Sequence, residues 1–100
     1  MIENFRTYNL AVAFYKECKS IKLPYHLRDQ LLRAASSVAL NLAEGSEKPT
    51  TADKMKFYFL AFCSMREVQA ILDLEIPETS LIYKTADHLA ASLYKLTHPS

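Results

Sequence analysis

The chain has 100 residues, of which 50% are hydrophobic and 23% charged; this suits one globular domain over residues 1–100 and excludes general disorder. One glycine and four prolines are too few turn-forming residues for an all-β sandwich or barrel. The formal net charge of +1 does not by itself indicate a polyanionic partner.

The first predicted helix covers about residues 4–21. Its apolar residues recur every three or four positions, as on a helix face, in the two series Phe5, Tyr8, Val12, Tyr15 and Ala11, Phe14, Cys18, Ile21. Pro24 follows and suits the first turn of the next helix, where its missing N–H costs nothing.

The second predicted helix covers about residues 25–44. At 100° per residue one face is apolar and comprises Leu27, Leu31, Ala34, Ala35, Val38 and Leu42. Gly45, the single glycine, is expected to end this helix in a left-handed conformation.

Two further helices are predicted, over about residues 51–74 and 78–96. Thr50 or Thr51 is the expected N-cap of the third. The fourth has a 4-3-4-3 seam typical of antiparallel bundles, formed by Ile82, Ala86, Leu89, Leu93 and Leu96. Short connections force neighbouring helices to run antiparallel, so the predicted fold is an all-α, up-down four-helix bundle.

The third helix is hydrophobic around almost its whole circumference, which is unusual for an outer helix of a small bundle. We expect another copy of the chain to cover its outer face, because soluble assemblies are mostly symmetric homo-oligomers. The predicted interface residues are Leu40, Phe57, Tyr58, Phe59 and Phe62. The alternative is that these side chains simply lie scattered on the surface of a small protein.

The sequence offers no pattern typical of an enzyme, a metal site or a cofactor site. His26, His88 and His98 lack partners at metal-ligand spacing, and a phosphate-binding loop needs more than one glycine. Cys18 and Cys63 are expected to be small buried hydrophobes, with a disulfide or a reactive thiol as the alternative. No segment reads as a signal peptide or a spanning helix, so we expect a cytoplasmic protein with neither a membrane nor a small-molecule substrate as partner.

Two groups of polar residues remain as candidate sites. Arg33, Ser37, Asn41 and Glu44 share one face of the second helix; they are predicted to form a polar network, with Glu67 as partner of Arg33 and Arg66 as partner of Glu44, or else a binding surface. The candidate nucleic-acid contacts are Lys16, Lys19, Lys22 and Lys48. A single chain offers few phosphate contacts, so this interpretation depends on several copies acting together; the alternative is a solvated helix end.

Two stretches carry a resemblance to a known family: QLLRAASSVALNLAEG, residues 30–45, and FYFLAFCSMREVQAIL, residues 57–72. They resemble the four-helix-bundle proteins encoded in intervening sequences of 23S ribosomal RNA, a family related to the accessory (Avd-like) proteins of diversity-generating retroelements. The residues that carry the likeness are Arg33, Ala34, Ser37, Val38, Asn41, Leu42, Ala43, Glu44, Gly45, Ser64 and Glu67.

The resemblance implies a homopentamer without enzymatic activity, and in the retroelement branch it implies binding to RNA or DNA and to a reverse transcriptase. We therefore expect a non-catalytic scaffold or interaction protein that serves a nucleic-acid process. The alternative is a purely protein-binding scaffold with no nucleic-acid role.

Overall fold

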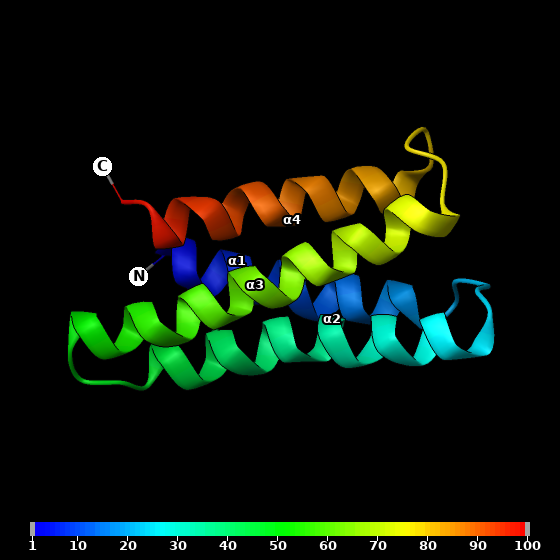
Figure 1. Ribbon diagram of the computed structural model, residues 1–100. Coiled ribbons are helices and arrows are strands. Elements are labelled where there is room, and N and C mark those ends of the chain that lie inside the picture. Colours follow the sequence, from blue (N-terminus) through cyan, green and yellow to red (C-terminus); the bar gives the residue numbers. More distant parts are fainter. Residues whose placement is uncertain (1, 100) are drawn as a thin grey trace.

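The computed structural model describes residues 2–99 and contains, within them, four α-helices: α1 (Ile2–Cys18), α2 (Tyr25–Ser46), α3 (Thr51–Glu75) and α4 (Leu81–Thr97). α2 packs against α1 and α3, and α4 packs against α3 and α1. Successive helices run in opposite directions, and both chain ends lie at the same end of the bundle (Figure 1). The predicted four-helix architecture is confirmed.

The core consists of the apolar faces that the sequence pattern predicts. On α4, Ile82, Ala86, Leu89 and Leu93 are buried and Leu96 packs against them from the edge, which confirms the predicted seam. The largest fully buried side chains come from all four helices and include Phe14, Leu31, Val38, Met65, Val68, Leu72, Leu89 and Leu93.

Hydroxyl side chains determine where α3 and α4 begin. The Thr50 Oγ1 accepts a hydrogen bond from the backbone N–H of Asp53 at 3.1 Å, which confirms the predicted N-cap. The Ser80 Oγ accepts one from the backbone N–H of Tyr83 at 3.4 Å. α4 therefore begins at Leu81, three residues later than predicted.

α1 ends at Cys18 and not at Ile21 as predicted. Beyond Cys18 the backbone makes tighter bonds to the third preceding residue, from Lys19 to Lys16, from Ser20 to Glu17 and from Ile21 to Cys18. The Ser20 hydroxyl also donates to the Glu17 carbonyl oxygen. Such local bonds compete with helix continuation, and Pro24 disfavours helical geometry at the residue before it.

The prediction that Gly45 ends α2 in a left-handed conformation is wrong. Gly45 is a buried residue inside the helix, which continues to Ser46, and its φ is not positive. A Cβ atom at this position would lie 2.8 Å from Cε1 of Tyr58 and 3.1 Å from Cβ of Phe57. Glycine is therefore required by the close approach of α3, and not by the backbone conformation.

Gly45→Ala tests this explanation. Alanine has the better helix propensity, by about 1 kcal/mol, so a site with free space would gain stability. Because the Tyr58 ring and the Phe57 Cβ occupy that space, we expect overpacking to dominate, with a net loss of about 1–2 kcal/mol in the free energy of unfolding, measured by urea denaturation. The same change in a Tyr58→Leu background should cost clearly less, and an equal cost in both backgrounds would contradict the explanation.

Leu93→Ala tests the packing of α4. Leu93 has no exposed surface, so truncation leaves a cavity and should lower the free energy of unfolding by about 2–5 kcal/mol. The matched control is Lys95→Ala on the exposed side of the same helix, which should change it by less than about 0.5 kcal/mol. Both are compared with the wild type at one protein concentration, because assembly shifts apparent stability. Equal effects of the two changes would place Leu93 outside the core.

Candidate interaction surfaces

Ser37, Asn41 and Gly45 follow one another at intervals of four residues and form the side of α2 that meets α3. The Ser37 Oγ and the Ser64 Oγ lie 2.8 Å apart and share a hydrogen bond. The Asn41 Nδ2 donates to the Ser37 backbone oxygen at 2.9 Å and to its Oγ at 3.0 Å. The residues of the sequence motif therefore form a half-buried polar seam between the two helices, which supports the structural interpretation of the stripe.

The charged members of the predicted network do not join this seam. The Arg33 guanidinium pairs with Asp29 at 2.9 Å, and the Glu44 carboxylate pairs with Lys48 at 2.9 Å. Each pair joins residues four positions apart and lies near solvent, where such pairs contribute little stability. The predicted partnership of Arg33 with Glu67 is therefore wrong.

The predicted pairing of Arg66 with Glu44 is wrong as well. The Arg66 guanidinium donates to the Gln69 Oε1 on its own helix at 3.2 Å. Between α3 and α4, two other pairs form hydrogen bonds: Gln69 Nε2 donates to Asp87 at 2.9 Å, and the Tyr83 hydroxyl donates to Asp73. That hydrogen bond raises the pKa of Tyr83 to about 12.

α3 presents a largely apolar outer face, as predicted, although Lys56 and Glu67 are also exposed on it. Exposed residues at helical spacing form it, and we call them the α3 stripe: Phe59, Leu60, Cys63, Ala70 and Leu74. Phe59 is 54% exposed. Leu40, from the neighbouring helix, is 67% exposed. Side chains of this size are costly to leave in water, so the face offers a docking surface.

The other predicted interface residues lie elsewhere. Tyr58 is 4% exposed and its hydroxyl accepts a hydrogen bond from Asn4 at 2.7 Å, so it belongs to the core of the single chain and not to its surface. Phe57 is half-buried with the Lys48 ammonium 5.0 Å from its ring centre. Phe62 is half-buried and meets the Tyr94 ring edge-to-face at 6.1 Å between centres.

A second apolar surface lies between α1 and α2 and was not recognised from the sequence. A half-open cavity of about 410 Å³ is lined there by Asn4, Phe5, Tyr8, Leu42, Ala43, Ser46 and Lys54; we call it the α1–α2 cavity. Phe5 is 71% exposed at its rim. The helical period does place Phe5 and Tyr8 on one face, but that face points away from the Ala11, Phe14 and Cys18 core.

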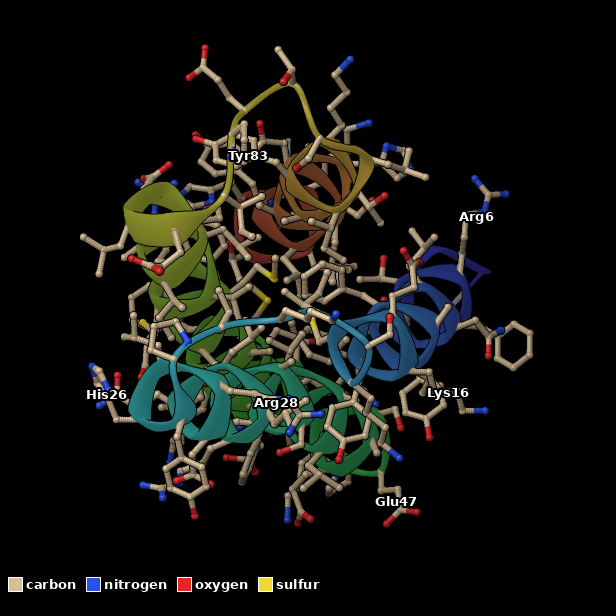
Figure 2. The ribbon with its side chains drawn as sticks, turned by 90° about the vertical axis from the view of Figure 1, so that its right-hand side faces the viewer. Arg6, Lys16, His26, Arg28, Glu47 and Tyr83 are labelled. Carbon is tan, nitrogen blue, oxygen red and sulfur yellow. The ribbon has the colours of Figure 1, made fainter. Side chains whose placement is uncertain are left out.

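Basic side chains gather at the end of the bundle where α1 joins α2. Lys16, Lys19 and Lys22 are exposed there, and Arg28 belongs with them because its guanidinium donates to the Lys19 backbone oxygen. Figure 2 views this end, with Lys16 and Arg28 labelled. Arg28 was missed because it lies on the next predicted helix. We call these four residues the basic end.

Lys48 does not belong to the basic end. It lies in the connection between α2 and α3, at the opposite end of the bundle from the α1–α2 connection (Figure 1). Its ammonium is held by Glu44, and that hydrogen bond raises the pKa of Lys48. The candidate nucleic-acid contacts are therefore not brought together into one surface.

The two cysteines differ, whereas both were predicted to be buried. Cys18 is buried, and burial, with a smaller effect of the Glu17 carboxylate, raises the pKa of its thiol to about 12. Such a thiol stays protonated and inert at neutral pH. Cys63 is exposed, so its predicted burial is wrong; it lies one turn after Phe59 on the outer side of α3.

The described residues offer neither a candidate metal site nor a membrane-spanning helix, and two comparisons with known proteins found no relative. Within residues 2–99 the side chains form no cluster of three or more His, Cys, Asp or Glu that could hold a metal ion. In the same residues, every helix is too short or too polar to cross a membrane. A search of curated proteins and a search of solved structures gave no significant match.

A family model described as 23S rRNA-intervening sequence protein matches residues 4–95. The match includes all of the α2–α3 seam, in which Ser37, Asn41, Gly45 and Ser64 meet. It covers nearly the whole of the described bundle, from the first turn of α1 to the last turn of α4. The chain therefore belongs to the 23S rRNA-intervening sequence protein family.

Proposed function

We propose that this protein is a non-catalytic structural subunit that assembles with copies of itself into a pentamer in the cytoplasm and serves a nucleic-acid process. The observation that carries the proposal is the outer face of α3, where Phe59 stands more than half exposed, together with exposed Leu40 on α2. Large contiguous apolar patches on soluble proteins mark interaction sites. The side chains below this face are already packed, so a partner must cover it from outside.

The energetics favour an assembly over a scattered apolar surface. Burying one fully exposed Leu or Phe contributes about 1.5–3 kcal/mol, and association costs at least about 4 kcal/mol in lost freedom of motion. The α3 stripe and Leu40 together supply several such side chains on one face. These side chains are about half to two-thirds exposed, so their combined burial is comparable to the minimum cost of association, and the partner surface that is buried with them adds to it.

The basic end supports the nucleic-acid part of the proposal. One copy brings Lys16, Lys19, Lys22 and Arg28 to one place. A ring of copies repeats this group, and repetition is what backbone binding needs, since affinity grows with the number of phosphates neutralised. The partner would then be RNA or DNA, together with proteins that act on it, such as a reverse transcriptase.

The net charge of +1 favours a second candidate, a scaffold that binds proteins alone. In this case the basic end is a solvated surface, and the assembly presents its remaining faces to a protein partner. Both candidates need the assembly, so they differ in the response to nucleic acid and not in the oligomeric state.

The assembly is tested by sedimentation equilibrium. We expect a particle of five times the 11.4 kDa mass of one chain, and we expect Phe59→Glu to dissociate it because the carboxylate would have to be buried unpaired. The control is Leu81→Glu, an apolar and even more exposed position on α4 that should leave the mass unchanged. A wild-type protein that sediments as a single chain at micromolar concentration would contradict the proposal.

Nucleic-acid binding is tested by fluorescence anisotropy with labelled double-stranded RNA and DNA. Binding through phosphates must weaken steeply between 50 and 200 mM salt, by tenfold or more for about two or three contacts. Lys19→Glu with Lys22→Glu should abolish it, whereas Lys95→Glu near the end of α4 should change it little. If neither nucleic acid binds at 50 mM salt while the protein remains assembled, the protein-binding scaffold is the function that stands.

A further inference from the structure

Two unlike apolar surfaces lie on different sides of the bundle. The α3 stripe projects outward, with Phe59 54% exposed. The α1–α2 cavity is concave, with a volume of about 410 Å³ and with Phe5 and Tyr8 at its rim. Viewed along the bundle axis, α3 and α1 lie on opposite sides (Figure 2). A single contact with two-fold symmetry uses one patch on both partners, so it would cover one surface and leave the other in water.

The charges on the two sides are complementary. Residues 1–24 contain four Lys or Arg against two Glu. α3 as a whole contains Asp53, Glu67, Asp73 and Glu75 against Lys54, Lys56 and Arg66, and most of its acidic residues lie in its second half, from Glu67 to Glu75. Contact between the α3 sides of two copies would bring like charges together, whereas contact between α3 and α1 pairs opposite charges.

We propose that the α3 stripe of one copy docks into the α1–α2 cavity of the next copy, with Phe59 as the inserted side chain. The proposal rests on the self-assembly proposed above and adds which two surfaces meet. A contact between unlike surfaces is head-to-tail, and it generates a closed ring when the rotation between copies closes. Each copy then covers both of its apolar surfaces, and every copy is equivalent.

A complementation experiment tests the proposal, using Phe59→Glu to disable the projecting surface and Phe5→Glu to disable the cavity. Because a head-to-tail chain needs both surfaces on every copy, each variant alone should sediment at the 11.4 kDa mass of one chain. An equimolar mixture retains one intact pair of surfaces, the α3 stripe of the Phe5→Glu copy and the cavity of the Phe59→Glu copy. It should form a one-to-one heterodimer and nothing larger.

Controls separate a lost contact from a lost fold. Phe5, Phe59 and Leu81 are all more than half exposed, so Leu81→Glu is the matched control and should assemble as the wild type does. Circular dichroism must show equal helix content in all variants. Should Phe59→Glu or Phe5→Glu lose helix, Phe59→Gln or Tyr8→Gln replaces it and the same pattern of masses is expected.

Cysteine crosslinking gives a second readout on intact assemblies. Cys63 lies one turn from Phe59 on the α3 stripe and is exposed, whereas Cys18 is buried. Asn9 lies beside Phe5 on α1. In Asn9→Cys, a short bis-maleimide should link neighbouring copies into a ladder of dimers, trimers and larger products, since each copy then carries one reactive cysteine on the α3 stripe and one beside Phe5 at the rim of the cavity. The wild type, with Cys63 alone, should give no ladder.

Three outcomes would overturn the head-to-tail contact while leaving self-assembly in place. The first is an assembled wild type that Phe5→Glu does not change. The second is a dimer formed by either variant alone, which indicates two separate two-fold contacts. The third is an efficient Cys63 crosslink to dimers in the wild type, which indicates that α3 meets α3. A wild type that sediments as one chain would instead overturn the assembly itself.

Discussion

The close contact between α2 and α3 determines much of the rest of the structure. Between Gly45 and the Tyr58 ring there is no room for even a Cβ atom, and the hydroxyls of Ser37 and Ser64 meet at 2.8 Å. At this distance the two hydroxyls are hydrogen-bond partners across the helices, which fixes how α2 and α3 slide and rotate against each other. The orientation of α3 set in this way buries Tyr58 and leaves Phe59 outside.

The hydrophobic period predicted the core well because burial is its cause. Phe14, Leu31, Leu89 and Leu93 are completely or almost completely buried where the helical wheel places them. Helix ends were predicted less well, because single side chains decide them: Ser80 begins α4 and Ser20 helps to end α1. Such local hydrogen bonds leave little trace in periodicity.

The candidate sites were predicted only in part. The pattern correctly indicated that Ser37 and Asn41 share one face, since four-residue spacing fixes it, whereas Ser64 was indicated by the family resemblance and not by the spacing. It failed for Arg33 and Glu44, whose long side chains reach Asp29 and Lys48 on the same surface at less cost in desolvation than a partner across the seam. The α1–α2 cavity lay beyond sequence reasoning, because a concavity depends on the shapes of three helices at once.

The shared location of both chain ends has a practical consequence for anyone who labels this protein. The bundle is about 40 Å long, and the start of α1 and the end of α4 lie toward one extremity while the α1–α2 connection, which carries Lys19 and Lys22, lies at the other (Figure 1). A fluorophore or affinity tag joined to either end therefore emerges far from these lysines. If the protein is tethered to a surface through such a tag, the basic end will face the solution and stay accessible to a binding partner.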